Sequence, residues 1–166
     1  MPAASGWRWN MPSLPPSDAA LDARLRLIVS SYQRLTGKLL IADAPTGIMV
    51  QRTALWNSFR AIVAHGTEDD PIFFYGNRLA LQLFGFGFEE FARLPSRLSV
   101  EALAQEARVQ LLEQVSRQGY VDGYSGVRIA KSGRRFMIAN ATVWNLLDEY
   151  GSYHGQAAVF DEQTTS

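Results

Sequence analysis

Few residues in this chain of 166 have side chains that could carry out chemistry on their own. There is no cysteine, and there are two histidines, His65 and His154. The missing thiols exclude disulfides, thiolate nucleophiles, zinc–thiolate sites and iron–sulfur clusters. Asp69 and Asp70 follow His65 closely, but this spacing matches no metal-binding motif, so we expect no metal site. We expect His65 to end a strand, with its imidazole hydrogen-bonded nearby.

The serines and glycines form no recognisable catalytic or phosphate-binding motif. Ser96 and Ser125 have no identifiable base and orienting acid in the sequence, so a hydrolase triad is not supported. The glycines at 85 and 87 lack the spacing of a phosphate-binding loop.

Composition narrows the class of protein. Lys and Arg total 16 and Asp and Glu total 16, so the net charge is zero. Nucleic acids and anionic membranes select basic surfaces, so we expect neither as a partner. No run approaches the roughly 18 apolar residues of a membrane span, and no signal peptide is visible, so we expect a cytoplasmic protein. Hydrophobic residues at 47% indicate a folded domain with a sizeable core.

The elements that must position these side chains begin after an irregular leader. Residues 1–17 contain four of the seven prolines, and the role of Trp7 and Trp9 within them is unknown. An amphipathic helix with Ser17 as its expected N-cap follows. Its apolar stripe consists of Leu21, Leu25, Ile28, Tyr32 and Leu35. A second helix is expected to start at Asp43 and to run through Trp56.

The rest of the chain has segregated strand and helix patterns. Strands are expected at 59–66, 71–75, 124–131, 135–146 and 153–160, short helices at 79–84 and 88–91, and a long helix at 99–118. The buried face of the long helix is expected to consist of Leu103, Ala107, Leu111 and Val115. This order is typical of the α+β class. We predict a single domain over 18–161 with a C-terminal tail at 162–166. Its strands are expected to form a five-stranded antiparallel sheet, with helices on one face in addition to the N-terminal helices.

An ordered set of short motifs resembles the MEKHLA domain, a PAS-related family. The matching motifs include His65-Gly66, Asp70-Pro71-Ile72-Phe73, Asn77-Arg78, Leu94-Pro95-Ser96-Arg97, Gly119-Tyr120, Tyr124-Ser125-Gly126, Val143-Trp144-Asn145-Leu146 and Gly155-Gln156-Ala157-Ala158. The resemblance covers roughly 18–161 and implies a PAS-like fold, of the stand-alone bacterial type. In plants, such domains end class III homeodomain–leucine zipper transcription factors, where they are assigned a role in dimerisation. No homeodomain or zipper motif precedes the domain here, so the resemblance does not imply DNA binding. Gly76 and the stretch 85–88 depart from the usual family pattern beside the expected pocket.

The resemblance also implies a ligand pocket between the sheet and the short helices. Polar side chains facing such a pocket would select the ligand, because buried polar groups need partners. The candidate ligand-binding residues are Tyr75, Asn77, Arg97, Arg128, Asn140 and Trp144. The cofactor stays unknown. Without cysteine, a flavin adduct or a thioester-linked chromophore is excluded, and a helix at 101–118 without histidine makes haem unexpected. A noncovalent flavin or a small organic ligand stays open.

Each candidate also has a structural alternative. Asn77 is favoured as a helix cap. Arg97 either pairs with an acid or binds a carboxylate or phosphate. Arg128 shares a strand face with Tyr124, and that face could point to solvent. Trp144 is most simply core.

Asn140 is the candidate with the clearest need for a partner. By two-residue spacing it is expected to share an apolar face with Phe136, Ile138 and Trp144. A polar side chain in such a row needs a cross-strand group or a ligand.

Three functions stay open at this point. The first is a non-catalytic sensory module that binds a small molecule and regulates a homodimer or a partner protein, with the N-terminal helix as the contact element. The second is a small isomerase or hydratase, with Asp69 or Asp70 as base and Tyr75 as acid in an apolar pocket. The third is a ligand-free dimerisation domain with a filled core. The sensory hypothesis predicts that Asp69 and Asp70 lie in an exposed turn.

Overall fold

A computed structural model describes residues 18–41 and 48–163. The expected leader at 1–17, with Trp7 and Trp9, lies outside the described residues, as does the expected helix start at Asp43. In chain order the elements are α1 (Ala19–Thr36), α2 (Ile48–Asn57), β1 (Ala61–His65), β2 (Phe73–Gly76), α3 (Arg78–Phe84), α4 (Phe88–Phe91), η2 (Ser96–Ser99), η3 (Ala102–Ala104), α5 (Gln105–Gln118), β3 (Tyr120–Ile129), β4 (Arg135–Leu147) and β5 (Tyr153–Gln163).

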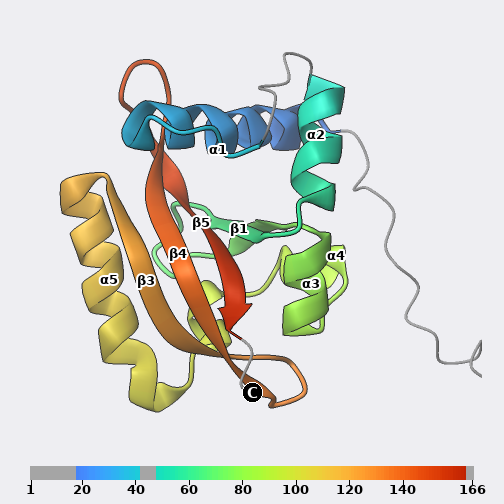
Figure 1. Cartoon of the computed structure of the whole chain (residues 1–166), viewed down its shortest axis with the longest axis vertical. Helices are drawn as coiled ribbons and strands as arrows, with labels where there is room; N and C mark the ends of the chain where they lie inside the picture. Colours follow the sequence, from blue (N-terminus) through green and yellow to red (C-terminus); the bar gives the residue numbers. More distant parts are fainter. Residues whose placement is uncertain (1–17, 42–47, 164–166) are drawn as a thin grey trace, which may run out of the picture.

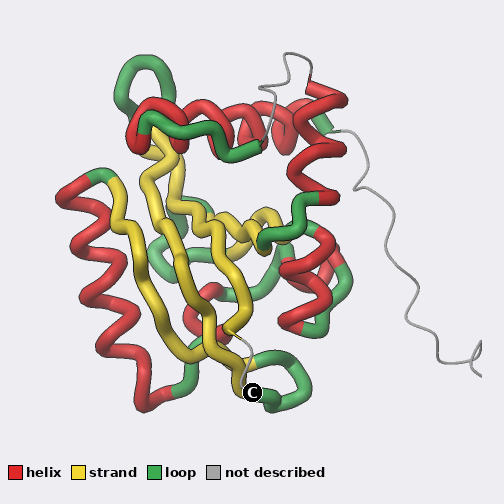
Figure 2. The backbone as a smooth tube through the Cα atoms, viewed as in Figure 1, coloured by secondary structure: helices red, strands yellow, loops and turns green. Residues whose placement is uncertain are grey.

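The five strands form one antiparallel sheet in the order β2-β1-β5-β4-β3. The predicted α+β class and five-stranded antiparallel sheet are therefore confirmed. The last strand lies at the centre of the sheet, where it joins the β1–β2 pair to the β3–β4 hairpin. Figure 2 shows this sheet as one curved layer with helices around it.

The two faces of the sheet are covered by different helices. On β4, Val143 packs with Leu111 and Val115 of α5, whereas its neighbour Trp144 makes an edge contact with Tyr32 of α1. Successive side chains of a strand point to opposite faces. Helix α5 therefore lies on one face of β4 and α1 on the other. Figure 1 shows α5 beside β3 and α1 across the upper ends of the strands.

Helix α1 begins and ends as its sequence predicts, with one shift at its start. The N-cap is Asp18, whose carboxylate accepts hydrogen bonds from the N–H groups of Ala20 and Leu21, and Gly37 closes the helix at φ 74°. Leu25 and Ile28 of the predicted stripe are buried in the core of the domain. The stripe therefore packs on the chain's own sheet instead of forming a free contact face.

The long helix is shorter than predicted. Two 3-10 turns, η2 and η3, precede α5, and the Ser99 hydroxyl donates to the carbonyl of Ser96 instead of capping a helix. Leu103, expected on the buried face, is fully exposed. Only Leu111 and Val115 of the predicted face are buried. The prediction was wrong here because the apolar period continues through a segment whose backbone has not yet become α-helical.

Strand ends also extend beyond the predicted bounds. Strand β3 starts at Tyr120 rather than at 124, and β5 continues to Gln163, into the segment expected to be a tail. The extra residues are held by backbone pairing with β4, as in the Met137–Gln163 pair. Ladder hydrogen bonds are made by backbone groups of any residue, so hydropathy alone ends these strands too early.

Candidate functional site

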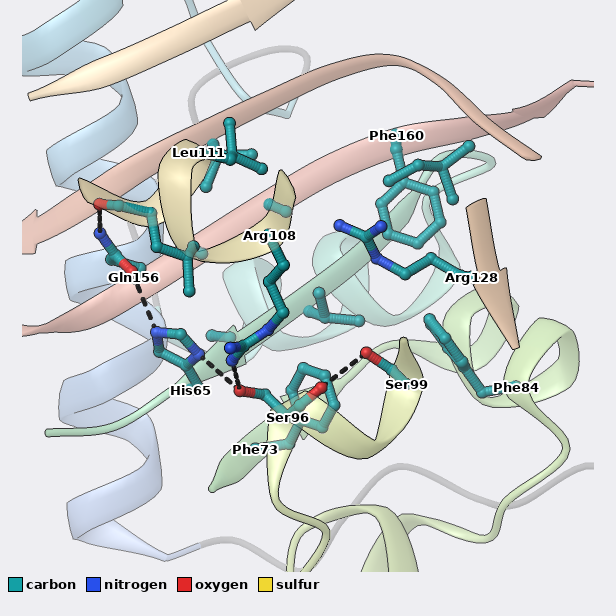
Figure 3. Close-up of a pocket in the computed structure, with 17 residues that line it drawn as sticks. His65, Phe73, Phe84, Ser96, Ser99, Arg108, Leu111, Arg128, Gln156 and Phe160 are labelled. Carbon is teal, nitrogen blue, oxygen red and sulfur yellow. Dashed lines mark hydrogen bonds between the residues drawn. The ribbon is translucent and has the colours of Figure 1, made fainter. Parts of the chain in front are cut away.

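A cavity of about 70 Å³ lies between the sheet and the helical side that contains α3, η2 and α5 (Figure 3). Most of its walls are apolar. The lining residues with polar side chains are His65, Ser96, Ser99, Arg108, Arg128 and Gln156.

The polar residues form one chain of hydrogen bonds at the edge of the cavity. His65 Nδ1 lies 3.1 Å from Ser96 Oγ, and His65 Nε2 lies 3.1 Å from Gln156 Oε1. Arg108 Nη2 donates to Ser96 Oγ at 2.5 Å. Beyond the cavity, Gln156 Nε2 donates to Asn145 Oδ1 at 3.1 Å. Figure 3 shows the links from Arg108 through Ser96 and His65 to Gln156.

The geometry fixes which atom donates and which accepts in each of these hydrogen bonds. Because the amide nitrogen of Gln156 donates to Asn145, its Oε1 atom must accept the bond from His65. His65 therefore carries its proton on Nε2, and its Nδ1 atom accepts from the hydroxyl of Ser96. The Ser96 oxygen in turn accepts from Arg108. We call this chain, Arg108–Ser96–His65–Gln156–Asn145, the polar relay.

His65 ends β1 with a hydrogen-bonded imidazole, as the sequence predicts. Burial lowers the pKa of His65 to about 4, although its hydrogen bond with Gln156 acts in the opposite direction. His65 is therefore neutral at physiological pH.

The serine–histidine contact does not make a hydrolase. The structure brings a base to Ser96 that the sequence did not reveal, but the third member is an amide, Gln156, which carries no charge to stabilise an imidazolium. A histidine with a pKa near 4 is also a weak base at neutral pH. Ser96 is only 3% exposed. The relay is a polar packing network.

Two arginines of the cavity, Arg108 of α5 and Arg128 of β3, bring positive charge to it. Neither belongs to any of the ion pairs formed within residues 18–41 and 48–163. Burial lowers the pKa of Arg108, and the positive charge of Arg128 lowers it further, while Asp70 acts in the opposite direction. Figure 3 shows both guanidinium groups projecting into the lined space from different walls.

Of the six predicted ligand residues, only Arg128 lines the cavity. It lies over the ring of Tyr124 at 5.8 Å, so these two residues do share a face, as predicted. Tyr75 is buried and makes an edge contact with Phe88 of α4, outside the cavity lining. Burial raises the pKa of Tyr75 well above its usual value.

Asn77 and Arg97 make contacts that explain them structurally. Asn77 caps α3 through the N–H of Ala80 and also bonds the backbone of β1 and α2, so its expected role as a cap is confirmed. Arg97 forms an exposed ion pair with Asp70, 3.0 Å between Nε and Oδ2. Neither lines the cavity.

Asn140 and Trp144 lie away from the cavity. The prediction that Asn140 shares one apolar face of the strand with Ile138 and Trp144 is wrong. Asn140 has φ 52° and sits where the register between β4 and β5 shifts, which marks a bulge. A bulge adds one residue and reverses the faces beyond it. Ile138 consequently lines the cavity, Asn140 is exposed and bonds Asp161, and Trp144 is buried beneath Tyr32.

Asp69 and Asp70 lie in an exposed turn, as the sensory hypothesis predicts. The isomerase or hydratase alternative needs one of these carboxylates inside an apolar cavity, and the structure contradicts that placement. Within residues 18–41 and 48–163, no three His, Asp or Glu side chains gather as metal ligands would. None of the helices in the same ranges combines the length and apolar character needed to cross a bilayer.

Sequence reasoning did not identify Arg108, Gln156 or the role of Ser96. Gln156 meets His65 because β5 pairs with β1, and nothing in the local sequence reveals that non-consecutive pairing. Arg108 did leave a signal, since it stands three and four residues before Leu111 and Leu112, on the side of α5 that faces the cavity. A charge at an inward helical position is a signal for a partner or a ligand.

Comparison with solved structures shows the fold. The chain resembles the PAS domain of a protein from Colwellia psychrerythraea, with a TM-score of 0.61, 21% identity, and coverage of 71% of this chain and 98% of that one. It also resembles the light-state dimer of the fungal blue-light photoreceptor Vivid, with a TM-score of 0.58, 16% identity, and coverage of 89% and 97%.

Comparison by sequence shows the family. The homeobox-leucine zipper protein ATHB-14 of Arabidopsis thaliana is 27% identical over 151 residues, which are 89% of this chain and 18% of that protein. HOX9 of Oryza sativa subsp. indica is 24% identical over 135 residues, 81% of this chain and 16% of that protein. The chain thus spans less than a fifth of these relatives. The model of the MEKHLA domain matches residues 22–165, and the chain therefore belongs to the MEKHLA domain family, with a fold like that of PAS domains.

Proposed function

We propose that this domain is a non-catalytic sensory module that binds a small molecule in the cavity and thereby regulates a homodimer or a partner protein. One observation carries the proposal: a cavity with apolar walls and an ordered polar edge lies between the sheet and the short helices. This combination of apolar walls with a few convergent polar groups is typical of ligand sites.

The size of the cavity limits what it holds. A cavity of about 70 Å³ suits a small molecule. The chain also has no cysteine for the adduct chemistry of light-sensing relatives of this fold. We therefore derive no flavin chemistry for the domain.

A sensory output requires a contact that differs between the free and bound states. The stripe of α1 is already buried, so we place the contact near the cavity. Four exposed apolar side chains lie on the elements around Arg108 and Arg128: Leu98, Leu103, Val109 and Val127. Exposed apolar groups of this kind are common in protein interfaces. The light-state dimer of Vivid, which has a similar fold, supports this use of the domain.

Native mass spectrometry and an absorption spectrum of freshly purified protein test the proposal. A retained species of fewer than about ten non-hydrogen atoms, together with a ligand-dependent change of mass in light scattering or of partner affinity, is the expected result. A protein that retains nothing, and whose unfolding temperature responds to no compound in a library of small metabolites, would overturn it.

A further inference from the structure

The cavity contains positive charge that nothing in the described part of the chain neutralises. Arg108 and Arg128 face it and belong to none of the ion pairs formed within 18–41 and 48–163. The carboxylate that acts on Arg108 is Asp70, and Arg97 already holds that group at 3.0 Å. Two half-buried like charges repel each other more strongly against apolar walls than they would in water.

The serine hydroxyl protons at the cavity are already used in hydrogen bonds within the domain. The Ser96 hydroxyl proton is committed to His65, and its oxygen accepts from Arg108. The Ser99 hydroxyl donates to the Ser96 carbonyl. A guanidinium has five N–H donors and no acceptor, so Arg108 and Arg128 keep unused N–H groups directed at the cavity. The free donors at the cavity are therefore those of the two arginines, and their positive charge selects an anion.

From these observations we infer that the ligand is a short-chain monocarboxylate held between Arg108 and Arg128. Guanidinium groups bind the two oxygens of a carboxylate through paired hydrogen bonds. The apolar walls, among them Leu111, Val143 and Phe160, accommodate a hydrocarbon tail. A tail of a few carbons suits a cavity of about 70 Å³, so we take a three-carbon acid as the probe. This inference rests on the proposed function and adds its ligand class.

An inorganic anion has the same charge but not the same fit. Phosphate would satisfy the guanidinium groups and would leave its remaining oxygens against Leu111, Val143 and Phe160, where they find no donor. We therefore expect discrimination in favour of the organic acid, and the experiment includes both.

The test uses the full chain and four probes at matched ionic strength: sodium propionate, its neutral isostere propionamide, inorganic phosphate and sodium chloride. Binding is measured by calorimetry and by the shift in unfolding temperature. Propionate alone is expected to bind. Arg108→Gln and Arg128→Gln are each expected to weaken propionate binding by about tenfold or more, since hydrogen bonds to charged groups are of that size.

The matched control is Arg117→Gln, on the opposite side of α5, nine residues after Arg108. It should leave propionate binding unchanged. Arg108 donates to Ser96 within the polar relay, whereas Arg128 lies outside it, so the unfolding temperature of each variant without ligand is measured beside its binding. A loss of propionate binding in an Arg128→Gln variant that unfolds at the parent's temperature cannot be ascribed to loss of fold.

Several results would overturn the inference. One is that propionate binds no better than chloride. A second is that phosphate or propionamide binds as well as propionate. A third is that Arg117→Gln weakens propionate binding as much as Arg108→Gln does. A neutral molecule retained in native mass spectrometry would also overturn it while leaving the sensory function intact. If nothing is retained and no small molecule binds, both the inference and the proposed function fail.

Discussion

At the scale of single residues, His65 couples the stability of the domain to pH. Its pKa is about 4 in the folded protein and 6.5 in the unfolded chain, so between these values only the unfolded chain binds the proton. The free energy of unfolding should be highest above pH 6.5 and should fall by roughly 3 kcal/mol as the pH is lowered to 4. Urea denaturation at half-unit pH steps measures this slope.

The variant His65→Gln should lose the slope between pH 6.5 and 4, even if it is less stable overall. His154→Gln is the control, because His154 is the other histidine and lies exposed beside Asp148. It should keep the slope. Carboxylates such as Glu68, whose pKa is lowered below 4.5, act mainly below this window. An unchanged slope in His65→Gln would contradict the assignment.

Asn77 makes more bonds than a helix cap needs. Its side chain serves four backbone groups, in Leu55, Arg60, Ile62 and Ala80. Asn77→Ala should lower the free energy of unfolding by about 3 kcal/mol, because the loss of the cap is added to buried groups left unpaired. Asp18→Ala removes an exposed cap alone and should cost about 1 kcal/mol. Similar costs in chemical denaturation would show that the bonds to β1 and α2 contribute little.

Local sequence predicted a residue's role where that role depends on near neighbours. The cap at Asn77 follows from the helix that starts one residue later, and the burial of Leu25 and Ile28 follows from their spacing. The role of Gln156 depends on a partner 91 residues away, so local sequence contains no trace of it. The cavity itself was predicted only through the family resemblance.

At the scale of elements, the bulge at Asn140 decides which face of β4 looks at the cavity. The φ of 52° is tolerated by Asn and Gly and is strained for branched residues. Asn140→Gly should change the free energy of unfolding little, whereas Asn140→Val should lower it by roughly 1–2 kcal/mol. Both are measured by urea denaturation, and equal stability of the two variants would contradict a strained backbone. Neither should weaken ligand binding, because Asn140 is exposed and outside the cavity lining.

Strand periodicity predicted that β4 exists, but not which side chains point inward along all of its length. The two-residue spacing holds from Phe136 to Ile138 and then changes face at the bulge. A bulge requires only one residue that accepts the local backbone, and Asn is common in ordinary turns and strand ends as well. The pattern therefore could not distinguish a regular strand from a bulged one.

At the scale of the whole molecule, the sheet depends on the close approach of β5 to β1 at Gly155. A Cβ atom there would overlap the backbone oxygen of His65, and φ is 127°. Gly155→Ala should therefore destabilise the protein by more than about 3 kcal/mol and displace Gln156 from His65. Gly151→Ala, in an open turn at φ 82° with nothing near its Cβ, should cost about 1 kcal/mol. Equal costs in urea denaturation would contradict the clash.

The central position of β5 has a consequence for how the protein is made. β1 leaves the ribosome well before β5, the strand that pairs with it on one side, and the pair His65–Gln156 closes a loop of 91 residues. Until β5 emerges, one edge of β1 has no strand beside it, and unpaired edges invite association with other chains. Folding of the sheet is thus expected to be completed only after synthesis of β5. A fusion that holds β5 inside the ribosomal tunnel for longer would extend the interval in which the nascent chain needs a chaperone.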